Sequence, residues 1–138
     1  MKYLLDTNVV SEGRRPTCDA RVRNWLNTQT PDDLAASVVT VLELGIGIRR
    51  IRRRDAKSAE ALQRWLDESV MPLFGDRVLV FDLDCALNAA PLHVPDPAPE
   101  RDAMIAGTAL AHGLTVVTRN THDFVRFGVP LVNPWLPM

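Results

Sequence analysis

The sequence has little of several residue types, and each shortage argues against a class of protein. Its two cysteines, Cys18 and Cys85, are far apart and form no CxxC pair, so we expect free thiols rather than a thiolate metal site. No apolar run approaches the roughly 20 residues that span a bilayer. The five residues before Asp6 are too few for a secretory signal. We therefore expect a cytoplasmic protein with no membrane association.

Lysine is also scarce, since Lys2 and Lys57 are the only lysines among 16 basic residues. The formal net charge is −1, so no global basic field indicates nucleic-acid binding. One dense arginine run stands out locally. Such a run can bind RNA phosphates, because guanidinium groups contact phosphate bidentately. It is equally compatible with a solvated helix end, where cations suit the helix dipole, or with a site for a partner's acidic tail. The run consists of Arg49, Arg50, Arg52, Arg53 and Arg54.

What is present is a chain of ordinary globular composition, with 46% hydrophobic and 24% charged residues. We expect residues 1–138 to form a single domain. Apolar, β-branched segments predict strands at 2–5, 34–39, 78–81, 115–118 and 130–133. Helical patterns lie between them, the one after the second strand beginning at Thr40 and the next ending at Pro72 and Gly75. This alternation predicts an α/β fold, a three-layer α/β/α sandwich around a mostly parallel five-stranded sheet.

Four separated acidic residues, Asp6, Glu43, Asp102 and Asp123, each lie where a predicted strand or loop passes into a helix. In a parallel α/β sheet these points gather at the carboxyl ends of the strands, where ligands bind. Four carboxylates meeting there repel one another unless a hard cation such as Mg²⁺ or Mn²⁺ neutralises them. The pattern therefore indicates a metal site.

Each of these acids also has an ordinary structural explanation. Asp6 and Asp123 can cap the helices that follow them, and Asp102 suits a helix N-terminus. Glu43 stands three residues after Thr40, the spacing of a capping box. Cap and metal ligand are compatible roles, because a cap position directs a side chain over the end of the sheet. Spacing alone leaves the choice open.

Four ordered motifs resemble those of PIN-domain ribonucleases, most closely the VapC toxins of VapBC toxin–antitoxin modules. The first is YLLDTNVVSE at 3–12, and the second is SVVTVLEL at 37–44 with Gly47 and Ile48. The third is RDAMIA at 101–106 with Thr108 and Ala109, and the fourth is LTVVTRN at 114–120 followed by Asp123 and Phe124. The match is collinear over nearly the whole chain.

This resemblance implies a PIN-like fold and a metal-dependent endoribonuclease that acts as the toxin of a type II module. It gives Asp6, Glu43, Asp102 and Asp123 the roles of catalytic metal ligands for Mg²⁺, with Mn²⁺ able to substitute. Whether Asp123 is a ligand, a holder of water or a cap stays open. The resemblance further implies an RNA substrate, a VapB-type antitoxin, a homodimer and a larger complex with the antitoxin. Thr7, Thr118 and Asn120 fall on neighbouring motif positions, where they would support the ligands or orient water.

One departure from the family, one competing motif and one alternative function stand beside the resemblance. The proline-rich stretch Pro91–Glu100 is shorter than the corresponding family segment, which puts substrate or partner contacts from that region in doubt. The segment FDLDCAL at 81–87 imitates a phosphatase nucleophile motif, but the lysine that such enzymes need downstream is missing. A catalytically silent PIN-like module that binds RNA or a partner is the remaining alternative. None of the histidines, His93, His112 and His122, is required by the proposed chemistry.

Overall fold

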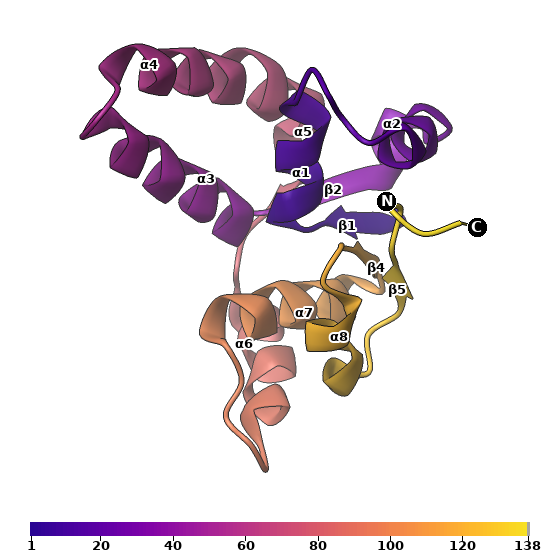
Figure 1. The fold of residues 1–138 in the computed structure, drawn as a ribbon. Helices are drawn as coiled ribbons and strands as arrows, with labels where there is room; N and C mark the ends of the chain where they lie inside the picture. Colours follow the sequence, from indigo (N-terminus) through magenta and orange to yellow (C-terminus); the bar gives the residue numbers. More distant parts are fainter. Residues whose placement is uncertain (138) are drawn as a thin grey trace.

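The computed structural model describes residues 1–137 and contains a five-stranded sheet in the order β3-β2-β1-β4-β5, with every neighbouring pair parallel (Figure 1). The predicted α/β sandwich with a parallel five-stranded sheet is therefore confirmed. β1 is the central strand, so a residue that follows it lies in the middle of the sheet's carboxyl edge. The strands are β1 Tyr3–Leu5, β2 Leu34–Ser37, β3 Val78–Leu79, β4 Thr115–Val117 and β5 Leu131–Val132.

Helices cover both faces of this sheet, as parallel strands require. The α-helices are α1 Thr7–Arg14, α2 Ala20–Asn27, α3 Val38–Arg52, α4 Ala56–Trp65, α5 Met71–Phe74, α6 Leu83–Ala89, α7 Glu100–His112 and α8 Thr121–Phe124. Short helical turns lie at Pro31–Asp33, Leu66–Val70, Gly75–Arg77, Ala90–His93 and Val125–Phe127. Over residues 1–137, every helix is too short or too polar to cross a membrane.

Successive strand residues supply two separate cores, because side chains alternate between the faces of a strand. Leu5, Ala36 and Val117 belong to the core beneath α1 to α5. Their chain neighbours Leu4, Ala35 and Val116 belong to the core beneath α7 and α8. Burying a leucine or valine side chain stabilises the fold by roughly 1.5–3 kcal/mol. The strands are thus held from both sides, which fixes where their carboxyl ends lie.

The passage from β2 into α3 differs from the prediction. The helix begins at Val38, and Ser37 is its N-cap, with the Ser37 hydroxyl accepting a hydrogen bond from the Val39 N–H at 3.0 Å. The predicted strand to Val39, the helix start at Thr40 and the Thr40–Glu43 capping box are therefore wrong. Serine is a stronger N-cap than threonine, which explains the earlier start. Glu43 lies in the second turn of α3, where its carboxylate is not needed as a cap.

The amphipathic segment before the third strand was predicted to end at Pro72 and Gly75, and of these two residues only Gly75 ends it. Helical backbone runs from Ala56 through the π-helical turn at Leu66–Val70 to Phe74, and Pro72 lies in the first turn of α5. Pro72 removes one main-chain N–H from this continuous helical segment, and the π-helical turn lies directly before it. The segment ends at Gly75, whose φ of 55° is accessible to glycine at little cost.

Candidate active site at the carboxyl edge of the sheet

Asp6 directly follows the central strand and is 5% exposed. It is the N-cap of α1, and its Oδ1 accepts a hydrogen bond from the Thr7 N–H at 2.8 Å. Its Oδ2 accepts one from the Thr118 hydroxyl, also at 2.8 Å. The cap role expected for Asp6 is thus present, and the same hydrogen bonds fix its carboxylate at the edge of the sheet.

Glu43 reaches the same edge from α3. The Thr7 hydroxyl lies 2.9 Å from Glu43 Oε1 and 3.1 Å from the Thr40 hydroxyl. Thr7 therefore joins two acids that are far apart in sequence, because its N–H donates to Asp6 while its hydroxyl donates to Glu43. On the other carboxylate oxygen, Oε2, a nitrogen of Arg101 lies 3.9 Å away.

Asp102 and Asp123 complete the acidic edge from α7 and α8. Burial, together with the negative charges of Asp6, Glu43 and Asp123, raises the pKa of Asp102 to about 6. The carboxyl groups of Asp6, Glu43 and Asp123 therefore all lie within electrostatic reach of Asp102. Asp123 is exposed and lies inside the first turn of α8, while Asn120 occupies the N-cap position, so the alternative that Asp123 caps this helix is wrong.

The raised pKa values of Asp6 and Asp102 indicate that too few positive charges lie near the acidic edge to balance its carboxylates. Burial raises the pKa of Asp6, and the charge of Glu43 raises it further, whereas the hydrogen bonds from Thr118 and Thr7 lower it. Carboxylates are the hard oxygen donors that Mg²⁺ and Mn²⁺ prefer, so the donor set fits such a cation. Yet within residues 1–137 no three acidic, histidine or cysteine side chains stand close enough together to enclose an ion. Binding would require the side chains to rotate inward or to use water as a bridge.

Thr118 and Asn120, which were expected near the acids, contact this network in different ways. The Thr118 side chain is fully buried and hydrogen-bonds Asp6 directly. Asn120 reaches the network through its main-chain N–H, which donates to the Thr118 hydroxyl at 3.0 Å. Asn120 is itself exposed.

Sequence reasoning missed three residues of the network: Asn8, Thr40 and Arg101. The Asn8 amide nitrogen lies 3.4 Å from both Asp6 Oδ2 and the Thr118 hydroxyl, and its oxygen accepts a hydrogen bond from the Arg119 N–H. The sequence did offer a signal for Asn8 and Arg101, because Asn8 lies two residues after Asp6 and Arg101 directly precedes Asp102 in the motifs. For Thr40 the signal was misleading, because the capping-box spacing assigned it another role.

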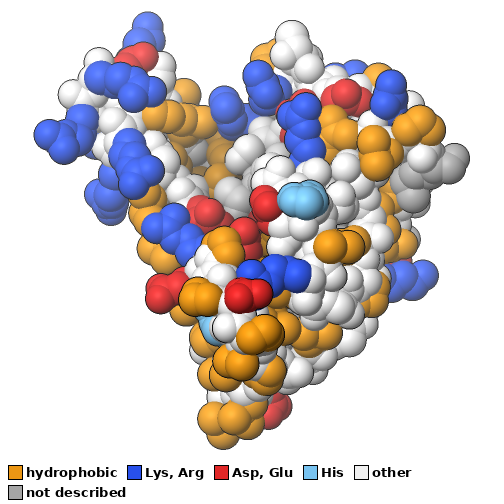
Figure 2. Space-filling view, turned by 60° about the horizontal axis from the view of Figure 1, so that its bottom comes forward, with side chains coloured by type: hydrophobic (Ala, Val, Ile, Leu, Met, Phe, Trp, Pro, Cys, Tyr) orange, Lys and Arg blue, Asp and Glu red, His pale blue; other side chains and the backbone are white. Residues whose placement is uncertain are grey.

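The arginine run lies apart from the acids. Arg49, Arg50 and Arg52 are in the last turn of α3, and the run continues into the link to α4, with every member exposed. Arg49 lies roughly 9 Å along the helix axis beyond Glu43. Figure 2 shows basic side chains at the outer end of the α3–α4 hairpin, with acidic side chains gathered between this end and the body of the molecule.

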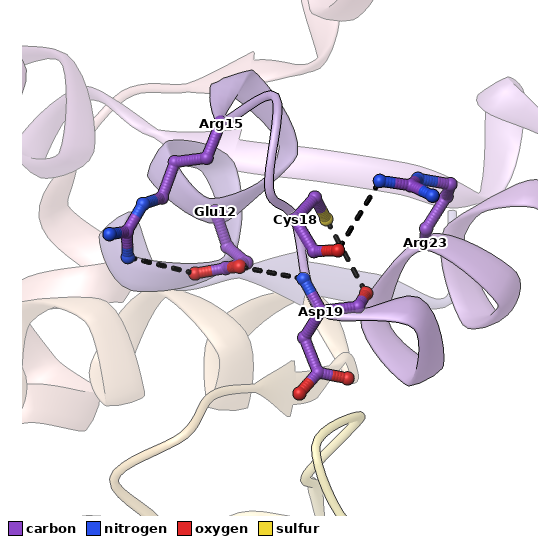
Figure 3. Close-up of polar contacts among 5 residues, drawn as sticks. All are labelled: Glu12, Arg15, Cys18, Asp19 and Arg23. Carbon is purple, nitrogen blue, oxygen red and sulfur yellow. Dashed lines mark hydrogen bonds and ion pairs between the residues drawn. The ribbon is translucent and has the colours of Figure 1, made fainter.

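Glu12 is the other buried acid of the first motif, and its partners are Asp19 and Arg15 rather than residues of the acidic edge. Its Oε2 accepts a hydrogen bond from the Asp19 N–H at 2.9 Å, and its Oε1 lies 3.5 Å from Arg15 (Figure 3). Glu12 therefore fixes the turn between α1 and α2. Beside that turn lies an apolar groove formed by residues of α1, α2, β2 and the α4–α5 segment, including Val9, Val10, Leu26, Trp65 and Leu73.

Comparisons with known proteins agree with this architecture. A family model described as PIN domain matches residues 3–129. Toxin FitB of Neisseria gonorrhoeae is 38% identical over 96% of this chain and 97% of its own length. The VapC ribonuclease Y4jK of Sinorhizobium fredii is 36% identical over 97% of this chain and 98% of its own length. The crystal structure of FitAcB from Neisseria gonorrhoeae superposes with a TM-score of 0.89 at 37% identity, covering 96% of this chain and 98% of the matched chain.

Proposed function

The chain belongs to the PIN-domain family, and from that membership and its acidic edge we propose that it is a metal-dependent endoribonuclease and the toxin of a type II toxin–antitoxin pair. The relatives named a toxin and a VapC ribonuclease match it over nearly their whole length, which supports this reading. One structural observation carries the proposal. Thr7 connects the carboxylates of Asp6 and Glu43 at the carboxyl edge of the sheet, beside Asp102 and Asp123.

We propose that Asp6, Glu43 and Asp102 hold Mg²⁺, or Mn²⁺ in its place, and that Asp123 completes the site. The ion, when bound, lowers the pKa of its water and stabilises negative charge on the phosphodiester. The protein contributes the placement of the ligands: Thr7 and Thr118 hold Asp6, and Thr7 also holds Glu43. In the metal-free protein the pKa of Asp102 is raised to about 6, so a proton competes with the cation for this carboxylate. RNA as the substrate agrees with a cytoplasmic location.

The test is RNA cleavage by purified protein with Mg²⁺ or Mn²⁺. Asp6→Asn and Asp102→Asn should each reduce cleavage by a factor of about 100 or more, because each replaces a charged ligand by a neutral amide. EDTA should abolish cleavage, and added Mn²⁺ should restore it. Asp84→Asn, which changes an exposed acid of α6, is the matched control and should cleave like the wild type.

Two results would show that the protein is a catalytically silent RNA-binding or partner-binding module rather than a nuclease. The first is absence of metal-dependent cleavage across structured RNAs. The second is toxicity in cells that persists in the Asp6→Asn variant. Mapping new 5′ ends after induced expression would identify the RNA and the cleavage sequence.

We further propose that the antitoxin occupies the apolar groove between α1, α2 and the α4–α5 segment. Leu73 is exposed beside it, and Trp65 forms part of its wall with Arg14 stacked over its ring at 5.8 Å. An apolar helix face fits such a groove, and the arginine suits an acidic flank. Leu73→Arg should weaken binding of the cognate antitoxin at least about tenfold and leave RNA cleavage unchanged. Equal affinity of variant and wild type would place the antitoxin elsewhere.

A homodimer is the remaining partner prediction. Light scattering at micromolar concentration should give twice the 15.4 kDa mass of one chain. A mass of one chain would contradict the dimer.

A further inference from the structure

Among residues 1–137, Arg101 is the one cation that contacts the acidic edge directly. Its guanidinium nitrogen lies 3.9 Å from Glu43 Oε2. This separation is longer than the roughly 2.7–2.9 Å of a charge-assisted hydrogen bond, so the two charges attract without a fixed geometry. The side chain of Arg101 is 47% exposed and that of Glu43 28%. Arg101 is therefore held loosely and has room to leave.

The position of Arg101 in α7 is unfavourable for a cation. It is the second residue of the helix, where the helix dipole favours negative charge. Other arginines of the fold, such as Arg77 and Arg126, donate hydrogen bonds to main-chain carbonyls and so anchor loops. Arg101 instead forms an ion pair with Glu43, a carboxylate of the acidic edge. This placement points to a role at that edge rather than in local packing.

We propose that Arg101 is a built-in counter-cation of the acidic edge, which occupies Glu43 in the metal-free protein and contacts the substrate phosphate once a divalent cation takes its place. Glu43 has one oxygen held by Thr7 and the other facing Arg101, so a cation binding at Glu43 competes with Arg101 for the second oxygen. The displaced guanidinium remains tethered at the mouth of the site, and its fork of donors matches the oxygens of a phosphodiester. This inference rests on the proposed nuclease function and adds to it a residue that contacts the substrate.

The first test measures Mn²⁺ binding to RNA-free protein by electron paramagnetic resonance. Arg101→Gln removes the competing charge and should tighten Mn²⁺ binding about two- to fivefold, the range expected for loss of a partly exposed ion pair. Arg101→Lys keeps the charge and should bind Mn²⁺ like the wild type. Arg64→Gln, at an exposed arginine of α4, is the control for the change in net charge and should also match the wild type.

The second test measures RNA cleavage at saturating Mn²⁺. Arg101→Gln and Arg101→Lys should both raise KM, by at least about fivefold for glutamine, because neither side chain offers the planar fork. A merely structural role for Arg101 would change the thermal midpoint and leave both the Mn²⁺ affinity and KM unchanged.

The outcomes separate this inference from the function on which it rests. If the wild type binds no Mn²⁺ and cleaves no RNA, both are overturned. If the wild type does both, but Arg101→Gln binds Mn²⁺ equally or more weakly or has an unchanged KM, only the role of Arg101 is overturned. Should the glutamine variant fail to fold, the lysine variant still decides, because a KM equal to that of the wild type contradicts the phosphate contact.

Discussion

Asp102 is the acid whose protonation depends most visibly on its neighbours. Burial comes first among the causes that raise its pKa, followed by the charges of Asp6, Glu43 and Asp123. The presence of an acid at this position could be read from the third motif. The elevation of its pKa could not be read from the motif, because the three charges that raise it belong to residues on other elements of the fold. The same holds for Arg101, whose partner lies on another helix.

The raised pKa predicts how the stability of the metal-free protein depends on pH. Between about pH 4 and pH 6 folded Asp102 retains its proton while the unfolded chain has released it, so the free energy of unfolding falls as pH rises through this window. Below the window the group is protonated in both states, and above it the loss persists. The contribution is of the order of 1 kcal/mol, since Asp102 is only half-buried and solvent screens its charge.

The measurement is chemical denaturation in EDTA at pH 4, 5, 6 and 7. The wild type should lose stability across the series relative to Asp102→Asn, which carries no titrating group at this position. Stability curves that run parallel for the two proteins would contradict the prediction. Saturating Mn²⁺ should restore more stability at pH 7 than at pH 5, because the ion competes with the proton.

At the scale of elements, α6 and α7 pack closely against each other. A β-carbon built on Gly107 of α7 would lie 2.7 Å from the Ala89 β-carbon and 2.9 Å from its main-chain N and Cα atoms. This approach fixes α7 against α6 and so helps to place the first turn of α7, which carries Arg101 and Asp102. The helix spans Glu100–His112 and ends at Gly113. The closeness of the two helices was not predictable, because a glycine inside a helix has no pattern that reveals its neighbour.

Gly107→Ala should therefore destabilise the protein by about 1–3 kcal/mol, since the new methyl group meets backbone that cannot shift easily. Gly45→Ala is the matched control within α3, where nothing lies within 4 Å of the added β-carbon. There alanine should stabilise the helix by about 0.5–1 kcal/mol. Denaturant unfolding measures both changes, and a Gly107→Ala variant as stable as the wild type would contradict the close approach.

The whole molecule combines a net charge of −1 with an uneven distribution of charge. Acidic side chains gather at the carboxyl edge, whereas the exposed arginine run lies apart from them at the outer end of the α3–α4 hairpin (Figure 2). We propose that an RNA strand bound at the acids extends toward this end of α3, where guanidinium groups would offset its phosphates. The run was visible in the sequence, and its direction relative to the acids follows from α3 being one continuous helix from Val38 to Arg52.

Replacing Arg52, Arg53 and Arg54 together by glutamine should weaken RNA binding and reduce its dependence on salt. Three lost phosphate contacts would lower the slope of log affinity against log salt by roughly 2 for single-stranded RNA. Fluorescence anisotropy with the cleavage-deficient Asp6→Asn protein, with and without the triple change, measures the slope. An unchanged slope would mean that the run is a solvated helix end.

The sequence by itself determined the fold class, because five short apolar segments alternating with amphipathic ones leave a parallel sheet covered on both faces as the consistent arrangement. It also determined that Asp6 directly follows a strand and that Asp102 lies near the start of a helix. The tertiary structure decided how those acids are held. Thr7 and Glu43 belong to different helices, and Asp6 and Thr118 directly follow the neighbouring strands β1 and β4, so their hydrogen bonds exist only because β1 lies between β2 and β4. Local spacing could assign Glu43 to a cap, whereas only packing could bring it to Thr7 and Arg101.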